Sequence, residues 1–305
     1  MMTYGFVGLG HLGSRLASLL LAAGFQVRVF DLDKSAANSL LKAGAQWAAT
    51  PAAAAEDVDG FITCLPNPAA SNETLLGEHG ALANMKRGST WLEMSTNDVA
   101  EIKRIAALAA ARAVDVLECP CSGGLHRATK GEMTVFVGGK KDIYERHRPA
   151  LQAMCGPMFY LGDLGSASLL KVITNMLCLI DLVATGEALM LAKKGGLDLA
   201  ECYRAICDSS GTSREFEDWA PVILNGSLNT GFTLDLALKD LGFGMSFGQS
   251  FGVNLKLTGL VERLLEEARD TYGGSAWTPH VVKMMEDAAG TTLRAAGFPD
   301  VIKPL

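Results

Sequence analysis

The chain has 305 residues, of which 49% are hydrophobic and 20% are charged, and its formal net charge is −6. This length suits about two domains, and the composition is ordinary for a soluble globular protein. An acidic chain without a long basic run is a poor match for nucleic acid or for an anionic membrane surface. We therefore expect neither as a partner.

Period-two alternation and short apolar runs predict strands in the first half of the chain, and helical patterns such as 34–43 and 100–113 lie between them. The predicted strands are 4–7, 25–31, 61–66, 89–95, 114–120, 133–139 and 157–162. Strands that alternate with helices indicate βαβ units and a parallel sheet covered on both faces. The first half is therefore expected to be an α/β, Rossmann-type doubly wound domain.

The second half has a different character, because no convincing strand follows Gly165. Its helical patterns cover 168–194, 198–208, 233–250 and 253–271. We expect two domains, 1–163 and an all-helical C-terminal domain at 164–305, joined by a long interdomain helix. So much apolar helix exceeds what one small domain buries, which predicts a homodimer or homotetramer.

The apolar segment 168–192 approaches membrane-spanning length, but it contains Lys171, Asn175, Asp181 and Glu187, so we expect a core helix and no membrane span. The N-terminal residues show no signal-peptide pattern. The seven cysteines are scattered and form no CxxC pair, which favours reduced thiols in a cytoplasmic protein. No HxxxH motif or Cys/His cluster supports a metal site.

The stretch "GLGHLG" places Gly8, Gly10 and Gly13 in the GxGxxG pattern, after a predicted strand and before a predicted helix. These glycines allow a tight turn, approach of a pyrophosphate to the backbone, and close packing of helix on strand. His11 and Leu12 complete the turn. The context predicts a dinucleotide-binding site in the first domain.

Asp31 ends the second strand, 18 residues beyond Gly13, where an acid is expected to bind the adenosine ribose hydroxyls. Its charge would repel a 2′-phosphate, so the pattern favours NAD over NADP.

Two further stretches, "CLPN" and "EMST", follow strands at the carboxyl edge, where ligands bind in such sheets. Leu65 and Pro66 are candidates for the adenine or ribose side and Thr96 for the nicotinamide ribose, and ordinary strand-end turns would explain both stretches equally well.

Ser122, Gly123 and Gly124 follow another strand, and their backbone N–H groups together with the Ser122 hydroxyl suit a carboxylate, although a plain glycine turn is the alternative.

Lys171 lies in the apolar helical pattern, with Asn175 four residues further on the same face. A lysine that acts as a base near neutral pH needs its pKa lowered from ~10.4 to about 7–8, and burial acts in that direction. Otherwise Lys171 would bridge to a surface carboxylate.

The chain resembles the β-hydroxyacid dehydrogenase family, which includes 3-hydroxyisobutyrate dehydrogenase, tartronate semialdehyde reductase and 6-phosphogluconate dehydrogenase. The resemblance covers nearly the whole chain through four motifs in order: "FVGLGHLG", "CPCSGGLHRATKGEMTVFVGG", "GSASLLKVITN" and "LALKDLGFG". It implies that Lys171 is the general acid/base, that Ser122–Gly124 and Asn175 bind substrate, and that Lys239 approaches the nicotinamide end of the cofactor. It also implies that Asp240 supports the loop of this last motif.

Several residues depart from the family pattern. Thr174 stands where the family has a first asparagine, and Glu118 and Cys121 replace an Asp and a Val, a change for which we expect little chemical effect. His126 and Arg127 stand where typical members carry small residues. They are candidates for contact with a second anionic or bulky polar group of the substrate, or they are solvated side chains.

The expected function is an NAD(P)-dependent oxidoreductase acting on CH–OH groups, which interconverts a small 3-hydroxyacid and its semialdehyde or keto acid in the manner of 3-hydroxyisobutyrate dehydrogenase. The substrate is a small molecule, and the sequence does not identify which hydroxyacid. The alternatives are an imine reductase-like NADPH enzyme, whose relatives carry Asp or Tyr in place of Lys171, and a non-catalytic cofactor-binding protein of the same fold.

Overall fold

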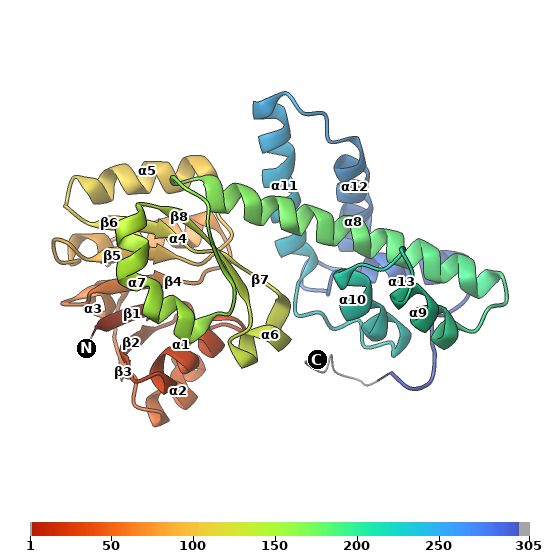
Figure 1. The fold of residues 1–305 in the computed structure, drawn as a ribbon, viewed down its shortest axis with the longest axis horizontal. Helices are drawn as coiled ribbons and strands as arrows, with labels where there is room; N and C mark the ends of the chain where they lie inside the picture. The colour runs from red at the N-terminus through yellow and green to blue at the C-terminus, as the bar shows by residue number, and fades with distance from the viewer. Residues whose placement is uncertain (1, 299–305) are drawn as a thin grey trace. The chain divides into compact units, whose positions relative to one another are not determined.

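A computed structural model describes residues 2–298 (Figure 1). The chain forms two compact units, of which the first is Met1–Lys171 and the second begins at Val172. The division falls inside helix α8 (Ser166–Lys194), eight residues after the predicted boundary at 163.

The first unit is built on a nine-stranded sheet in the order β3-β2-β1-β4-β5-β6-β8-β7, with β9 paired to β8. The strands are β1 (Thr3–Val7), β2 (Gln26–Phe30), β3 (Gln46–Trp47), β4 (Gly60–Thr63), β5 (Thr90–Glu93), β6 (Asp115–Glu118), β7 (Cys121–Ser122), β8 (Thr134–Gly139) and β9 (Met158–Tyr160). The pairs from β3 through β6 are parallel, whereas β8 runs antiparallel to both β6 and β7. The expected parallel sheet is therefore confirmed up to β6, and the antiparallel part and the two-residue strands were not predicted.

Helices cover both faces of this sheet, as a doubly wound fold requires. Neighbouring strand residues enter different cores: Phe6 packs in one hydrophobic cluster, and Val7 packs in the other with Phe61. This alternation follows from the period of two along a strand. The helices are α1 (Gly13–Ala22), α2 (Asn38–Lys42), α3 (Pro51–Ala55), α4 (Pro68–Leu76), α5 (Val99–Ala110), α6 (Gly124–Lys130) and α7 (Lys141–Met154), with 3-10 turns η1 (Lys34–Ala37) and η2 (Ala81–Ala83).

The second unit is helical, as predicted, and within the described residues its only β-type pairing is one isolated bridge between Thr233 and Trp277. After α8 come α9 (Leu199–Cys207), α10 (Arg214–Leu224), α11 (Leu234–Phe251), α12 (Lys256–Tyr272) and α13 (His280–Ala289). Side chains of Asp198, Ser213 and Thr233 accept backbone N–H groups at the starts of α9, α10 and α11, which explains where these helices begin. Helices α10 and α13 were not predicted.

Helix α8 is long and apolar enough to cross a membrane by length and composition alone. Its residues Leu179, Leu182 and Leu189 are buried in the hydrophobic cluster of the second unit. The helix therefore supplies core surface to this unit, which is the role that the sequence predicted.

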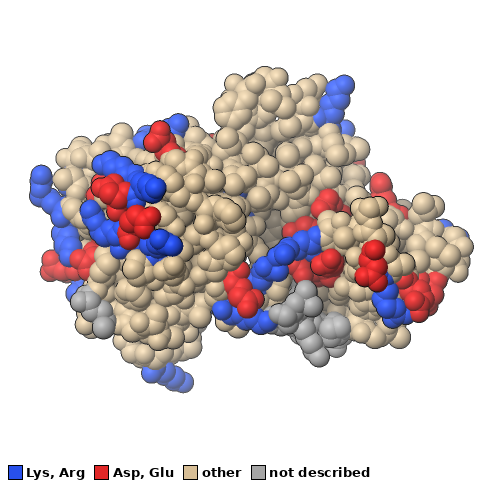
Figure 2. All heavy atoms as spheres, viewed as in Figure 1, with Lys and Arg blue, Asp and Glu red and all other residues tan. Residues whose placement is uncertain are grey.

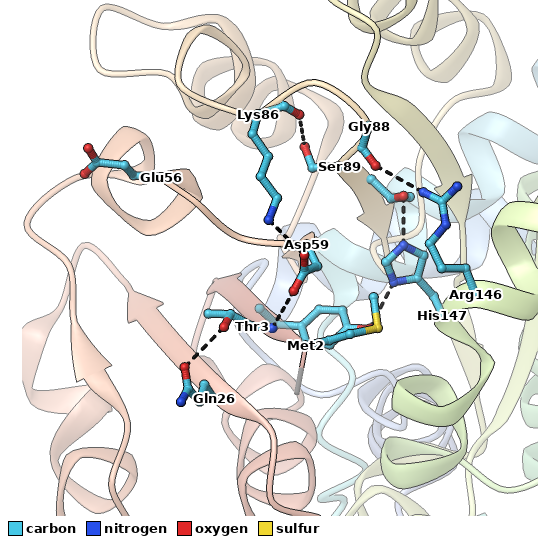
Figure 3. Close-up of polar contacts among 12 residues, drawn as sticks. Met2, Thr3, Gln26, Glu56, Asp59, Lys86, Gly88, Ser89, Arg146 and His147 are labelled. Atoms are coloured by element: carbon cyan, nitrogen blue, oxygen red, sulfur yellow. Dashed lines mark hydrogen bonds and ion pairs between the residues drawn. The ribbon is translucent and has the colours of Figure 1, made fainter.

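Polar groups at the amino ends of the central strands form a hydrogen-bond network (Figure 3). The His147 ring lies between the Tyr4 hydroxyl (2.9 Å from Nδ1) and the Thr90 hydroxyl (2.8 Å from Nε2). Beside it, Asp59 accepts hydrogen bonds from Lys86 Nζ (2.8 Å) and from the backbone N–H of Thr3 (2.9 Å). Burial lowers the pKa of His147 to about 4, so the ring is neutral at physiological pH.

Candidate active site

The predicted glycine turn joins β1 to α1 in the geometry that a dinucleotide needs. Gly8 has a φ of +92°, and a Cβ there would lie 2.3 Å from the Cys64 carbonyl oxygen. A Cβ at Gly13 would lie 1.9 Å from the Gly8 carbonyl oxygen, so the helix packs directly on the turn. At Gly10, by contrast, a Cβ would meet nothing within 4 Å. The turn therefore leaves open space where the second glycine of the motif admits a pyrophosphate, so its residues fit the expected cofactor.

Asp31 lies beside this turn, directly after β2. Its Oδ2 accepts the backbone N–H of Leu9 (2.6 Å), and its Oδ1 accepts that of Asp33 (2.9 Å). These two hydrogen bonds fix the carboxylate at the edge of the turn, which is where the acid of an NAD site is expected. Of the other turn residues, His11 is exposed and Leu12 half-buried.

Two further predicted cofactor segments are tied together by a buried glutamate, Glu93, at the end of β5. Its carboxylate accepts hydrogen bonds from the Thr63 hydroxyl (3.1 Å) and the Ser95 backbone N–H (2.8 Å). The Ser95 hydroxyl in turn accepts the backbone N–H of Leu65 (2.8 Å). Burial raises the pKa of Glu93, and these hydrogen bonds oppose the shift. Glu93 thus holds the Leu65 segment against the segment that carries Thr96.

Pro66 is exposed in the turn before α4, and Asn67 caps that helix by accepting the N–H of Ala70 (2.9 Å). The "CLPN" stretch therefore contains an ordinary helix start as well as a candidate cofactor contact. No sequence signal singled out Glu93, because a glutamate at a strand end gives no hint of its partners.

The Ser-Gly-Gly segment is not a simple loop: Ser122 ends β7, and Gly124 begins helix α6. Gly123 and Gly124 have φ values of +130° and +71°, which L-residues with a side chain rarely adopt. The Arg127 stem and the His126 ring lie over these glycines. Arg127 Cδ is 2.8 Å from the position of a Cβ at Gly123, and His126 Nδ1 is 3.2 Å from that at Gly124. Arg127 and His126 are half-buried, so they are not fully solvated side chains, and they lie on a helix.

Glu118, at the end of β6, anchors the start of helix α8. Its Oε1 accepts the backbone N–H groups of Gly165 (2.7 Å) and Ala167 (2.8 Å), and its Oε2 accepts the Ser168 hydroxyl (2.6 Å). A carboxylate at a helix N-terminus satisfies N–H groups that have no partner within the helix and interacts favourably with the helix dipole. A Cβ at Gly138 would lie 2.2 Å from Oε1, so that glycine makes room for the carboxylate.

This anchor links the two predicted substrate segments. Glu118 ends β6 and precedes Ser122, the last residue of β7, by four residues, and Lys171 follows Ser168 by three residues on α8. The structure gives Glu118 three hydrogen bonds that the comparison with the family motif did not predict. In the sheet it pairs with Glu93 of β5, so two buried glutamates lie side by side.

Lys171 and Asn175 share one face of α8, as their spacing predicted, and they are only 8% and 9% exposed. In the second unit, Asn175 Nδ2 donates to Asp240 Oδ2 (2.5 Å), while Lys239 Nζ forms an ion pair with Asp240 Oδ1 (2.6 Å). One buried carboxylate therefore holds two of the predicted site residues. Both Lys239 and Asp240 lie on helix α11.

The first unit thus brings the predicted cofactor residues other than Lys239 together at the carboxyl ends of β1, β2, β4 and β5, as a doubly wound sheet should. The contact of Lys239 with the nicotinamide, and the substrate contacts of Ser122, Gly123, Gly124 and Asn175, stay predictions.

The cysteines near this edge are poor candidates for nucleophiles. Burial raises the pKa of the Cys119 thiol, and the neighbouring Cys155 thiol together with burial raises that of Cys121. A thiol that stays protonated is a weak nucleophile. Within residues 2–298 no group of three His, Cys, Asp or Glu side chains is arranged to hold a metal ion.

The chain is similar to known proteins over almost its full length. A family profile described as the NAD binding domain of 6-phosphogluconate dehydrogenase matches residues 3–162. Another, described as NAD-binding of NADP-dependent 3-hydroxyisobutyrate dehydrogenase, matches residues 165–285. The chain is 30% identical to 2-(hydroxymethyl)glutarate dehydrogenase of Eubacterium barkeri, covering 95% of this chain and 96% of that one.

The 3-hydroxyisobutyrate dehydrogenase of Pseudomonas aeruginosa is 32% identical over 85% of this chain and 89% of its own. A crystal structure described as 3-hydroxyisobutyrate dehydrogenase from Salmonella typhimurium has a TM-score of 0.86 and 29% identity, covering 93% of this chain and 100% of that one. An imine reductase of Streptomyces aurantiacus, at 21% identity and a TM-score of 0.63, shares the fold alone. The chain belongs to the β-hydroxyacid dehydrogenase family, and it is an oxidoreductase with an NAD(P)-binding domain.

Proposed function

We propose that the protein catalyses the reversible, NAD(P)-dependent oxidation of a small β-hydroxyacid to its semialdehyde or keto acid. The observation that carries this proposal is the buried Lys171 residue on α8, a helix whose first turn is anchored by Glu118. A buried lysine with an amide one turn away suits proton exchange with an alcohol or carbonyl oxygen. The names of the two dehydrogenase relatives support the same class of reaction.

In the oxidation direction, the Lys171 amine accepts the proton of the substrate hydroxyl and later releases it to solvent. Asn175, one turn further on the same face, orients the hydroxyl oxygen. The Ser122–Gly124 segment binds the substrate carboxylate through backbone N–H groups and the serine hydroxyl. NAD(P)⁺, held at the glycine turn of residues 8–13, would supply the hydride acceptor for this oxidation. Holding these groups in reach of the substrate supplies the positioning part of the rate enhancement.

A spectrophotometric screen tests the reaction class. Purified protein is assayed at the absorbance of the reduced nicotinamide with NAD⁺ and with NADP⁺ against 3-hydroxyisobutyrate, 2-(hydroxymethyl)glutarate, 4-hydroxybutyrate and phenylserine, and in reverse with tartronate semialdehyde. We expect turnover of at least one β-hydroxyacid. Cofactor binding without any hydride transfer would instead support a non-catalytic protein, and activity confined to cyclic imines would support an imine reductase.

For the cofactor we propose NAD rather than NADP. The support is the position of Asp31, whose carboxylate is held beside the glycine turn by the N–H groups of Leu9 and Asp33. A 2′-phosphate at this edge would meet a negative charge. A preference of the wild-type enzyme for NADPH would refute this assignment.

We also propose that the protein assembles as a homodimer or homotetramer through its helical unit. Apolar side chains are exposed on α8 at Leu177 (53%) and around the tip of the α11–α12 hairpin at Phe251 (64%) and Leu257 (55%). The visible surface of this hairpin is mostly uncharged (Figure 2). Light scattering of the wild type and of Leu257→Glu tests the assignment, since a charge on a buried interface should dissociate the oligomer.

A cytoplasmic location is proposed from the thiols. All seven cysteines are free in the structure, including Cys121 and Cys155, whose sulfur atoms are 3.7 Å apart without a bond. A reducing compartment keeps such a pair as thiols. Fractionation of the source cells would test this, and recovery of the protein from an oxidising compartment would contradict it.

A further inference from the structure

Arg127 is held over the Ser-Gly-Gly segment by its own helix. Side chains on a helix lean toward its N-terminus, so residue 127 lies over the residue four positions earlier. Its Cδ accordingly fills the space that a Cβ at Gly123 would take. The absence of a side chain at position 123 therefore serves two purposes: it allows the positive φ, and it lets the arginine stem lie against the turn.

The guanidinium group at the end of this stem has one donor that no described protein group accepts. Arg127 Nε is buried, and no hydrogen-bond acceptor for it is present among residues 2–298. A guanidinium group keeps its charge at every pH that a folded protein experiences. Buried donors of charged groups normally have an acceptor, and such an orphan donor calls for an explanation. An oxyanion supplied by a ligand would provide one.

Two ligands could supply this oxyanion. One is a second acid group on the substrate, because the arginine stem lies on the segment proposed to bind the first carboxylate. The other is the cofactor's phosphates, because α6 lies beside α1, as the hydrogen bond from Arg15 Nε to the Thr129 hydroxyl (3.1 Å) shows. The glycine turn at 8–13 already provides open backbone for the phosphates, whereas the Arg127 stem lies directly on Gly123 of the proposed substrate segment. The substrate is therefore favoured.

We propose that Arg127 forms a subsite for a second carboxylate or sulfonate on the β-hydroxyacid, which makes dianionic substrates the preferred class. This inference rests on the proposed function and narrows it. The planar fork of the guanidinium suits such groups, and charge-assisted hydrogen bonds to them are the strong ones.

The kinetic test compares two substrates that differ at one end only. 2-(Hydroxymethyl)glutarate carries a second carboxylate, and 2-(hydroxymethyl)pentanoate ends in a methyl group instead. The wild type should favour the diacid in kcat/KM by about 10-fold or more, the value of a charge-assisted pair. Arg127→Met should reverse or abolish this preference, and Arg127→Lys should keep part of it. Arg148→Met, on an exposed arginine of α7, removes the same charge elsewhere and should leave the preference intact.

A binding test separates failure of this inference from failure of the proposed function, because it needs no turnover. Glutarate and pentanoate are titrated calorimetrically into the NADH-loaded full chain. Tighter binding of glutarate that is lost in Arg127→Met supports the subsite even if no hydroxyacid is oxidised. Equal binding of the two acids by the wild type overturns it. A larger loss of NADH affinity than of glutarate affinity in Arg127→Met also overturns it and assigns the arginine to the cofactor's phosphates.

Discussion

The two ends of the same β-strands are built in opposite ways. At the amino ends, the His147 ring bonds to the Tyr4 and Thr90 hydroxyls, and all three residues are fully buried (Figure 3). At the carboxyl ends, Gly10 faces open space, and Arg127 carries a buried donor without an acceptor among the described residues. Closed networks stabilise a fold, whereas incomplete ones are expected where ligands bind.

The buried carboxylates at the carboxyl ends show how the open edge is kept in shape. Glu93 and Glu118 accept hydrogen bonds from the segments that bear the candidate site residues, so they hold the edge without filling it. We therefore predict that substitutions at the carboxyl ends lower mainly activity, whereas substitutions at the amino ends lower mainly stability.

The largest expected effect follows from Lys171→Ala. Removal of a general acid/base should lower kcat by about 10² to 10⁴-fold while the NADH dissociation constant stays nearly unchanged. Lys141→Ala, on an exposed lysine of α7, is the matched control and should behave like the wild type. Comparable turnover in Lys171→Ala would refute the assignment of this residue.

Changes at Glu118 are expected to have the next largest effect. In Glu118→Ala the first turn of α8 loses three hydrogen bonds, and a misplaced Lys171 should lower kcat by about 10²-fold. Glu118→Gln can still accept both backbone N–H groups at one oxygen, so it should lie closer to the wild type. Steady-state kinetics per NADH-binding site and thermal unfolding are measured together. A lower melting temperature with unchanged kcat would show that Glu118 only stabilises the fold.

Variants of two glycines distinguish the space that the cofactor needs, at Gly10, from the packing of the turn, at Gly13. Gly10→Val adds a side chain in open space, so it should lower NADH affinity by about 10-fold or more and leave the stability of the cofactor-free protein unchanged. Gly13→Ala places a Cβ against the Gly8 carbonyl and should lower that stability. Calorimetric titration and thermal unfolding measure the two effects. Equal NADH binding by Gly10→Val and the wild type would show that the cofactor does not use this space.

A smaller effect is expected at Asp31. Asp31→Ala removes the charge that would face a 2′-phosphate, so it should raise the ratio of kcat/KM for NADP⁺ to that for NAD⁺ by about 10-fold. The ratio is measured with both cofactors at constant ionic strength. An unchanged ratio would mean that the carboxylate only caps the turn at Leu9.

The smallest effect on activity, and a clear effect on stability, is expected at His147. Its folded pKa of about 4 lies below the ordinary value of 6.5, so its contribution is complete above pH 6.5 and is lost as the pH falls toward 4. Between pH 7.5 and 4.5 the wild type should lose roughly 2 to 3 kcal/mol more unfolding free energy than His147→Gln. Denaturant unfolding at both pH values measures this difference, and parallel losses in the two proteins would contradict it.

The parts of this structure that the sequence predicted depend on local patterns. The glycine turn, Asp31 and the main strands follow from residues close in the chain, and the Lys171–Asn175 pair follows from helical spacing. Strands β3 and β7 are only two residues long, too short for alternation to show. Helix α6 was missed because its two leading glycines are typical of a turn.

The remaining features depend on contacts between distant residues, which one sequence does not reveal. Glu118 accepts hydrogen bonds from residues 47 to 50 positions later in the chain, at the start of α8. Asn175 is hydrogen-bonded to Asp240, which is 65 positions later. Likewise, whether Arg127 Nε has a hydrogen-bond acceptor depends on which residues surround it in the fold. Sequence comparison identified Glu118 as a departure from its family, but only the structure shows what its carboxylate holds.

An isotope-labelling experiment tests directly whether hydride passes from a β-hydroxyacid to the nicotinamide with the help of Lys171. A β-hydroxyacid that the screen identifies is prepared with deuterium on the carbon that bears the hydroxyl, and the nicotinamide product is examined by NMR after turnover. We predict that the deuterium is recovered at C4 of the reduced nicotinamide, and that Lys171→Ala forms almost none of this product. Reduced cofactor without deuterium, or equal labelling by Lys171→Ala, would contradict it.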